Sequence, residues 1–139
     1  MTARCFVDTN LFLYAGSKDP ADAAKKERAR QVIASEDVGI SAQVLQEFIA
    51  AAASKKRLGI DPAEVKATLT ALLAFPNVPI TARLVLRAWE IKSRYQISYW
   101  DGAIVAAAQE LSCEVIYSED LNDGQSYGGV VVRNPFPHT

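Results

Sequence analysis

The sequence predicts an α/β protein with a mostly parallel sheet of five strands and helices on both faces of the sheet. Two observations predict this class. Short apolar runs rich in β-branched residues alternate with longer segments whose apolar residues recur at helical spacing. Parallel strands need long crossover connections, which the helical segments supply. With 139 residues and no internal repeat or linker, we expect one domain spanning residues 1–139.

The expected strands are short and come in a regular order along the chain. Each is an apolar run of strand length that ends at a polar or turn-forming residue. The five predicted strands are residues 3–8, 38–41, 77–81, 114–118 and 130–135.

The helical segments between them carry start signals. In residues 61–64, Asp61 is placed as the N-cap, Pro62 as the first helical residue and Glu64 as the third, ahead of apolar residues at helical spacing. Asp19 begins a similar signal ahead of a helix over residues 24–34. Further helices are expected after residues 8–10, over 41–56 and over 98–111.

The composition narrows the protein class. Half of the residues are hydrophobic and 22% are charged, which is typical of a soluble globular protein. No apolar stretch is long enough for a signal peptide or a membrane span, so we expect no membrane association and a cytoplasmic location.

Cys5 and Cys113 have no metal-ligand spacing and are expected to be buried thiols. The single histidine, His138, lies in the tail, and we expect no catalytic role for it.

The balance of acidic and basic residues does not decide whether the protein binds nucleic acid. The net charge is only −1, and this value by itself does not indicate a nucleic-acid-binding protein. Basic residues nevertheless gather at 25–30, at 55–57 and between Arg83 and Arg94. These clusters are either solvated helix faces or a basic rim around an acidic site.

Four of the 16 acidic residues occupy positions that a structural role explains poorly: Asp8, Glu47, Asp101 and Asp120. Asp8 follows the first strand, and the carboxyl ends of strands line the ligand crevice of open α/β sheets. Asp8 could equally cap the helix that follows. Glu47 lies at the edge of the apolar face formed by Val44, Leu45, Phe48, Ile49 and Ala52, where a solvated flank is the alternative.

Asp101 lies within the predicted apolar arc of its helix. A carboxylate turned toward a core is costly unless it is paired, hydrogen-bonded or metal-bound. The alternative is a capping box with Ser98 as N-cap, and both roles are compatible. The residues expected to face the core are Trp100, Ile104, Val105, Ala108 and Leu111.

Asp120 follows the fourth strand, within the acidic stretch SEDLND that also contains Glu119 and Asp123. If the first and fourth strands are neighbours, Asp8 and Asp120 lie close together, and repulsion must be relieved by a proton or a cation. Oxygen ligands without histidine or cysteine favour Mg²⁺ or Mn²⁺ over zinc. Such a site can direct water onto a phosphodiester. Glu119 is most simply a solvated neighbour, and Asp123 is either a turn-former or an additional acid.

The motifs FVDTN, ISAQVLQEF, SYWDGAIVAAA and VIYSEDLNDG, in this order, resemble those of the PIN-domain ribonucleases, specifically the VapC-type toxins of toxin–antitoxin systems. The resemblance implies a three-layer α/β/α sandwich, endoribonuclease activity dependent on Mg²⁺ or Mn²⁺, a VapB-like antitoxin partner that inserts into the active-site groove, and a homodimer. It covers nearly the whole chain. Gly102 is a departure, because the family often has alanine there.

The resemblance also implies roles for individual residues. Asp8 and Asp101 would be metal ligands, and Glu47 and Asp120 would complete the cluster directly or through water. Asn10 and Ser118 match the polar positions that support the acids by hydrogen bonding.

Two rival functions remain at this point. A phosphoryl-handling α/β protein also places an aspartate after its first strand, but the haloacid-dehalogenase type has a second aspartate where this chain has Asn10, and a receiver domain has a lysine after its last strand. A non-catalytic binding module on the same scaffold would tolerate neutral replacements of Asp8 and Asp101.

Overall fold

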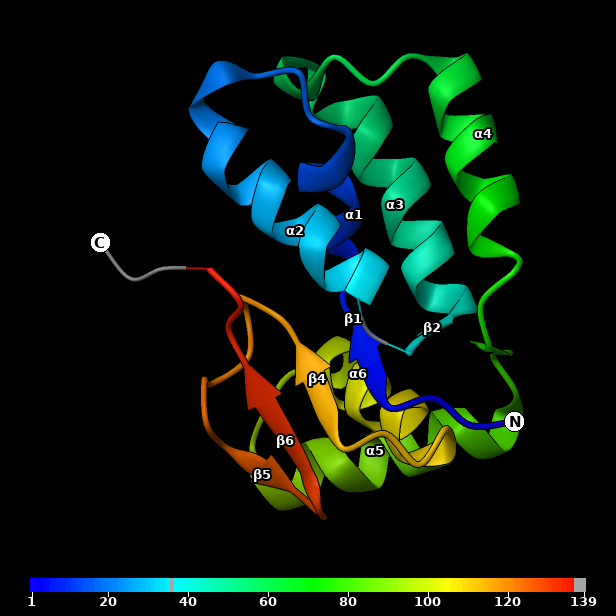
Figure 1. The fold of residues 1–139 in the computed structure, drawn as a ribbon. Coiled ribbons are helices and arrows are strands. Elements are labelled where there is room, and N and C mark those ends of the chain that lie inside the picture. Colours follow the sequence, from blue (N-terminus) through cyan, green and yellow to red (C-terminus); the bar gives the residue numbers. More distant parts are fainter. Residues whose placement is uncertain (36, 137–139) are drawn as a thin grey trace.

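A computed structural model describes residues 1–35 and 37–136 (Figure 1). The predicted tail position of His138 lies outside the described residues. The strands are β1 (Cys5–Val7), β2 (Val38–Ser41), β3 (Asn77–Val78), β4 (Val115–Tyr117), β5 (Ser126–Tyr127) and β6 (Val130–Arg133). The helices are α1 (Thr9–Gly16), α2 (Ala23–Ser35), α3 (Ala42–Ser54), α4 (Pro62–Leu72), α5 (Ala82–Tyr95) and α6 (Tyr99–Glu110), with 3-10 turns at Pro20–Asp22 and Lys56–Leu58.

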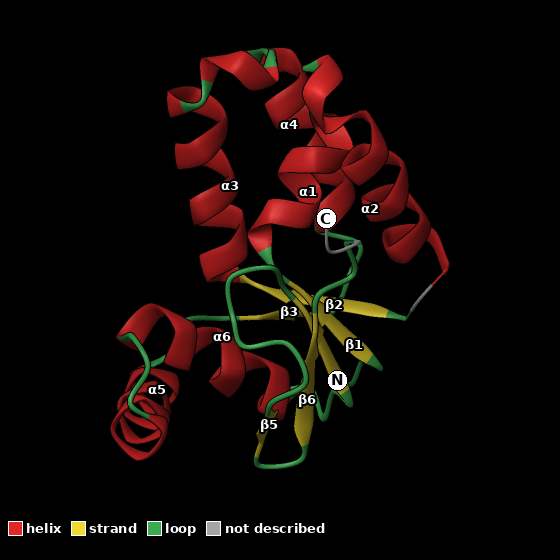
Figure 2. Cartoon of the chain, turned by 90° about the vertical axis from the view of Figure 1, so that its left-hand side faces the viewer, coloured by secondary structure: helices red, strands yellow, loops and turns green. Residues whose placement is uncertain are grey.

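The elements form three layers, which confirms the predicted α/β/α class. Figure 2 shows the sheet in the middle, with α1 to α4 on one side and α5 and α6 on the other. Helix α6 packs against β2, β4 and β6 from its side, and α3 contacts β2 from the opposite side. Among the described residues, no helix is both long and apolar enough to cross a membrane.

The sheet order β3-β2-β1-β4-β6-β5 places the first and fourth strands side by side, as predicted. In that pairing, which is parallel, Val7 lies opposite Tyr117. The carboxyl ends of β1 and β4 therefore meet at one edge of the sheet. Strand order reverses there, which is where open α/β sheets bind ligands.

The predicted strand count of five is wrong, because β5 adds a sixth, antiparallel strand beside β6. The two strands are joined by Gly128 and Gly129, which both have positive φ, at 59° and 96°. Such a turn strongly favours glycine. The strand is only two residues long and is anchored by Tyr127, which is fully buried and packs edge-on against Tyr95.

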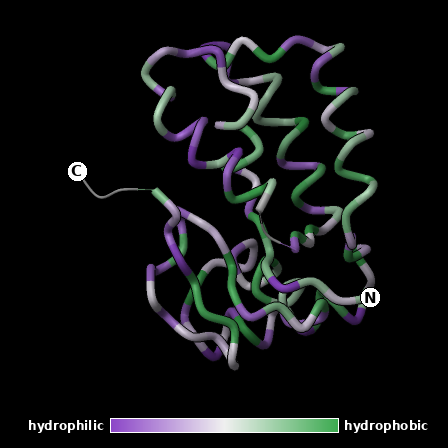
Figure 3. Tube along the Cα trace, viewed as in Figure 1, coloured by the Kyte–Doolittle hydropathy of each residue, from purple (hydrophilic) through white to green (hydrophobic). Residues whose placement is uncertain are grey.

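The strands supply the apolar centre of the molecule. Phe6, Val7, Ile40, Ile116 and Val132 are all completely buried. In the hydropathy view the hydrophobic colours run through the strands, whereas α2 is mostly hydrophilic (Figure 3). Cys5 and Cys113 are buried as predicted, and burial raises the pKa of the Cys113 thiol to about 12, so this thiol is unreactive.

The predicted helix starts are confirmed by hydrogen bonds. The Asp61 carboxylate accepts from the Glu64 amide at 2.9 Å, and the Glu64 side chain completes the capping box. Asp19 caps the Pro20–Asp22 turn that leads into α2.

Gly102 is explained by the crossing of α5 and α6. A Cβ atom at this position would lie 2.6 Å from the carbonyl oxygen of Ala88 and 3.3 Å from the amide nitrogen of Lys92. No side chain fits there unless the helices separate. The glycine is thus a consequence of close helix packing, and the alanine that the sequence resemblance leads us to expect here would require a wider crossing.

Candidate active site

Asp8, Glu47, Asp101 and Asp120 all line one pocket of about 210 Å³ at the carboxyl ends of β1 and β4. They come from four separate places in the chain: the end of β1, helix α3, the first turn of α6 and the loop after β4. The remaining lining residues are Thr9, Asn10, Leu13, Ala51, Lys55, Trp100 and Ile104.

Asp8 is both a helix cap and a member of the pocket. Its carboxylate accepts hydrogen bonds from the Thr9 amide at 2.7 Å and from Ser118 Oγ at 2.9 Å. Burial raises its pKa to about 6, against the lowering effect of these hydrogen bonds, and the negative charges of Glu47 and Asp120 add to the rise. The site therefore holds a carboxylate that resists ionisation without a compensating positive charge.

Glu47 is held in place through both of its oxygens. Gln43, one turn earlier on α3, donates to Oε1 at 2.7 Å, and Thr9 Oγ1 donates to Oε2 at 3.0 Å. The alternative of a solvated flank is therefore wrong for this residue. The apolar face of α3 differs from the expected one at Ile49, whose surface is 46% exposed because this side chain borders a cavity described below.

Asp101 stands at the third position of α6, with Ser98 as N-cap accepting from the Asp101 amide at 3.1 Å. The cap orients the residue while its carboxylate still lines the pocket. Partial burial raises the pKa of Asp101, the Ser98 hydroxyl lowers it, and the charge of Glu47 raises it. The prediction that Trp100 faces the core is wrong, because its side chain is 65% exposed at the pocket rim.

Asp120 is fixed from two directions. Asn10 Nδ2 donates to its carboxylate at 3.1 Å, and its own amide donates to Ser118 Oγ at 3.2 Å. Partial burial raises the pKa of Asp120, and the neighbouring charges of Glu119 and Asp101 raise it further. Lys55 acts in the opposite direction.

Asn10 and Ser118 occupy the positions expected of supporting residues. Ser118 is completely buried, donates to Asp8 and accepts from the amides of Asp120 and Leu121 at 3.2 and 3.4 Å. One hydroxyl therefore ties the end of β1 to the loop after β4.

Replacing Ser118 with alanine should lower the free energy of unfolding by about 1–3 kcal/mol, because the buried Leu121 amide, the part-buried Asp120 amide and a buried Asp8 carboxylate oxygen lose their partner. Denaturant unfolding measures this loss. Ser126→Ala is the matched control, since Ser126 is exposed on β5. Equal stability of the two variants would contradict the central place of Ser118 in the site.

Glu119 is not the solvated neighbour that the sequence indicated. Its carboxylate pairs with Lys25 of α2 at 2.9 Å and accepts from the Tyr14 hydroxyl at 2.6 Å, and its side chain is only 18% exposed. Asn10 Nδ2 lies 3.4 Å from the same carboxylate and thereby links Glu119 with Asp120. This network fixes the loop after β4 to the α1–α2 pair.

Asp123 lies outside the residues that line the pocket. Its carboxylate accepts from the Asn134 amide at 2.9 Å and so fastens the loop to the chain beyond β6. Asp123 also lies in a turn closed by the Gln125 amide and the Asn122 carbonyl at 3.2 Å, so the turn-forming alternative is supported over an additional acid in the pocket.

Lys55 was not singled out as a site residue from the sequence. It lies directly after α3 and lines the pocket close enough to lower the pKa of Asp120. The helical spacing of Glu47, Ala51 and Lys55 would have placed all three on one face. It adds a positive charge at the edge of an acidic pocket.

The donor set fits a hard divalent cation. All four carboxylates offer oxygen, and burial and mutual repulsion raise the pKa of three of them. Within residues 1–35 and 37–136, no three acidic, histidine or cysteine side chains already converge into a ligand cluster. Repulsion between uncompensated carboxylates opposes such convergence, and a cation would remove that opposition.

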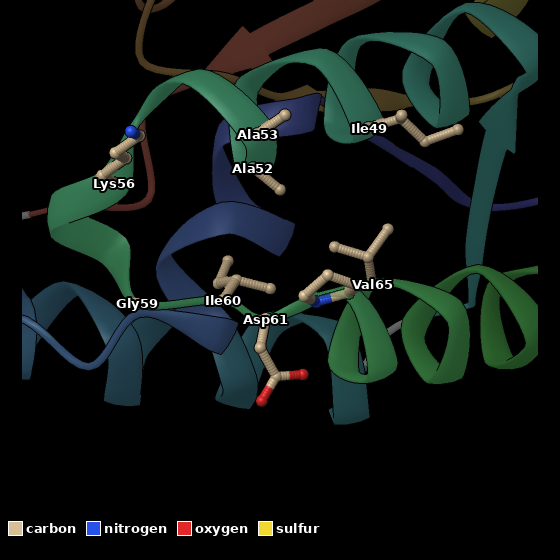
Figure 4. A pocket seen from close by; sticks show the side chains of 9 residues that line it. Ile49, Ala52, Ala53, Lys56, Gly59, Ile60, Asp61 and Val65 are labelled. Carbon is tan, nitrogen blue, oxygen red and sulfur yellow. The ribbon is translucent and has the colours of Figure 1, made fainter.

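A larger cavity, about 570 Å³, lies on the other face of α3, against the start of α4 (Figure 4). Ile49, Ala52, Ile60 and Val65 give it a mainly apolar lining. Figure 4 shows the Asp61 carboxylate pointing away from this cavity, in keeping with its capping role. The cavity has none of the converging polar groups of the acidic pocket, which is therefore the better candidate for chemistry.

Comparison with known proteins agrees with this assignment. The family model described as PIN domain matches residues 5–122, which include all four acids. The chain belongs to the PIN-domain family. The resemblance seen in the sequence is thereby confirmed.

The PIN fold of this chain is shared by several solved structures, while no curated protein sequence matches it. One is the VapC20 toxin of Mycobacterium tuberculosis, which is described as cleaving the sarcin-ricin loop. The two structures align with a TM-score of 0.67 and 24% sequence identity, and the alignment covers 84% of this chain and 89% of the toxin. Another is a toxin–antitoxin complex from Klebsiella pneumoniae: TM-score 0.69, 21% identity, covering 95% and 98%. A third is VapBC2 of Rickettsia felis bound to a DNA fragment from its promoter: TM-score 0.58, 16% identity, covering 93% and 96%. At these identities the likeness shows the fold.

Proposed function

We propose that this PIN domain is a divalent-metal-dependent endoribonuclease of the VapC type, acting in the cytoplasm. The observation that carries the proposal is the single pocket lined by four carboxylates from four separate parts of the chain. Membership of the PIN family and the likeness to a toxin described as cleaving the sarcin-ricin loop support RNA as the substrate.

In this proposal Asp8 and Asp101 hold Mg²⁺ or Mn²⁺, and Glu47 and Asp120 complete the site directly or through water. The bound cation would lower the pKa of water and neutralise charge on the phosphate. Ser118 and Asn10 fix Asp8 and Asp120 through the hydrogen bonds described above. Gln43 and Thr9 do the same for Glu47.

Lys55 would bind the backbone of the RNA next to the acids, because this residue lines the acidic pocket and lies close enough to lower the pKa of Asp120. A cation at the rim attracts phosphates without carrying sequence information.

The experiment that tests the proposed function is an end-group analysis of RNA cut by the purified protein. Water would form the new bond to phosphorus while the bond to the 3′ oxygen breaks, so the products carry 5′-phosphate and 3′-hydroxyl ends. Cyclic 2′,3′-phosphate ends would show attack by the neighbouring ribose hydroxyl and would contradict a water-directing metal site. Intact RNA in the presence of Mn²⁺ would contradict nuclease activity altogether.

A VapB-like antitoxin is the proposed protein partner. Two of the structurally similar proteins were solved as toxin–antitoxin assemblies. By insertion into the active-site groove, the antitoxin would keep RNA away from the acids. A small protein encoded beside this one that blocks RNA cleavage at equimolar concentration would support this partner.

We also infer a homodimer, with α5 as the contact. Val85, Leu86 and Trp89 lie on one face of this helix and are 42%, 58% and 57% exposed. Exposed apolar residues grouped in this way are typical of an interaction surface. A second copy would cover them.

Trp89→Glu should convert the dimer into a monomer, because a charge would be buried in an apolar contact. Analytical ultracentrifugation measures the change, and Glu90→Gln on the same helix is the control. A variant that sediments like the unmodified protein would contradict α5 as the interface.

The two rival functions make different predictions. A phosphoryl-handling enzyme would release phosphate from small phosphomonoesters, whereas the proposed site cuts within RNA. A binding module would keep its function in Asp8→Asn and Asp101→Asn. Neither rival explains why the acids of α3 and α6 line the same pocket as those of the sheet edge.

A further inference from the structure

Trp100 has an unusual position for a tryptophan. Its side chain is 65% exposed, although it directly precedes the acid Asp101 and lines the acidic pocket. Large apolar surface left in water is unfavourable. An exposed indole at the edge of a polar pocket therefore indicates a ligand that covers it when bound.

The indole is held in a defined place. The ring packs edge-on against Tyr99, with centroids 5.0 Å apart and an interplanar angle of 77°. The carbonyl of Trp100 accepts from Gln43 Nε2 at 3.2 Å, and the same amide group donates to Glu47. The backbone that carries the ring is thus tied to the acids themselves.

The residues around Trp100 indicate which kind of ligand would bind to its ring. Lys55 lines the same pocket and provides a positive charge for a phosphate, while Trp100 provides a flat apolar surface. A ligand that is both aromatic and anionic satisfies both groups. Nucleotides have this combination, and stacking on an aromatic side chain with a basic residue on the backbone is the usual way that single strands are bound.

We propose that Trp100 is a substrate-binding residue on which a nucleobase next to the scissile phosphate stacks. This inference rests on the proposed nuclease function, since it places the stacked base beside the acids that act on the phosphate. Stacking accepts any base, so Trp100 contributes affinity and selects a nucleotide that is free to leave its own stack.

Steady-state cleavage of a labelled, mixed-sequence single-stranded RNA tests the role. Trp100→Ala should raise KM on the order of tenfold with little change in kcat, because stacking would stabilise the bound substrate and the transition state alike. Trp100→Phe should restore KM to within about threefold, since a ring is still present. A purely structural role would lower thermal stability in both variants, which melting curves would show.

Fluorescence gives a readout that does not depend on cleavage. The only two tryptophans are Trp89 and Trp100, so Trp89→Phe leaves Trp100 as the single reporter. In the inactive Asp8→Asn background, the RNA should quench this reporter, whereas an abasic ribose-phosphate oligomer of equal length should not. Trp100→Phe, which leaves Trp89, should show no quenching by either oligomer.

Two outcomes would overturn the proposal. Equal KM values for Trp100→Ala and the unmodified enzyme, with RNA cleaved in both cases, would refute stacking and leave the nuclease function standing. Emission of the Trp100 reporter that changes with protein concentration and not with RNA would show a contact between copies of the chain instead. An unmodified protein that cuts no RNA would refute the proposed function, and the fluorescence titration would still decide whether a base stacks on Trp100.

Discussion

Asp101→Asn is expected to lower metal-dependent RNA cleavage by about 100-fold or more while leaving the fold intact. Loss of residues that only support metal ligands typically costs 10- to 100-fold, and a direct ligand should cost at least as much. Asparagine keeps the shape of aspartate, and the cap at the start of α6 is provided by Ser98, so the helix should remain. Initial rates at saturating Mn²⁺ measure the effect.

Glu110→Gln is the matched control for this experiment. It removes one negative charge from the other end of α6, where the residue is exposed and outside the pocket. Cleavage should stay within about twofold of the unmodified enzyme, as for surface charges without a specific partner. If Asp101→Asn and Glu110→Gln cut RNA equally well, Asp101 has no part in the chemistry.

Asp8→Asn should make the metal-free protein more stable above pH 6, even though it removes activity. The folded-state pKa of Asp8 is about 6, above its ordinary value of 3.8, mainly because the group is buried. The folded protein therefore holds a proton that the unfolded chain releases, and the stability from Asp8 is lost as pH rises from about 4 to 6. Once Asp8 is fully ionised, the free energy of unfolding is lower by about 3 kcal/mol than with Asp8 protonated. Asparagine is neutral at every pH, so the variant does not lose this stability.

Urea unfolding in the presence of a chelator, measured across pH 4 to 8, tests this expectation. The difference in free energy of unfolding between Asp8→Asn and the unmodified protein should grow through this range and level off. Adding Mn²⁺ at pH 7 should stabilise the unmodified protein and leave the variant unchanged, because only the former would bind the ion. If the difference in free energy of unfolding did not change with pH, the pKa of Asp8 would not be raised in the folded protein.

Much of the site was predictable because it depends on local signals. Asp8 and Asp120 each follow a short apolar strand, and the alternation of strands and helices predicts that such strands are parallel and end at the same edge. Asp101 and Glu47 show up as acids at or near an apolar helix face. These four predictions need only the periodicities of strands and helices.

The errors concern contacts between distant parts of the chain. The partners of Glu119, Lys25 and Tyr14, lie 94 and 105 residues away in sequence, so nothing near Glu119 indicates an ion pair. Trp100 follows the helical pattern of its core-facing neighbours, yet it sits in the first turn of α6, at the mouth of the pocket, where the apolar arc is no longer covered. Strand β5 has two residues and depends on the burial of Tyr127, which is a tertiary effect.

The central claim is that the four carboxylates act together through a bound divalent cation. The most direct measurement is the rate at which metal-depleted protein cuts RNA as Mn²⁺ is returned in steps. We predict no cleavage in chelator, a saturable rise with Mn²⁺ for the unmodified enzyme, and no rise for Asp8→Asn or Asp101→Asn. Cleavage that persists in chelator, or that rises equally in the two variants, would contradict the metal-dependent site.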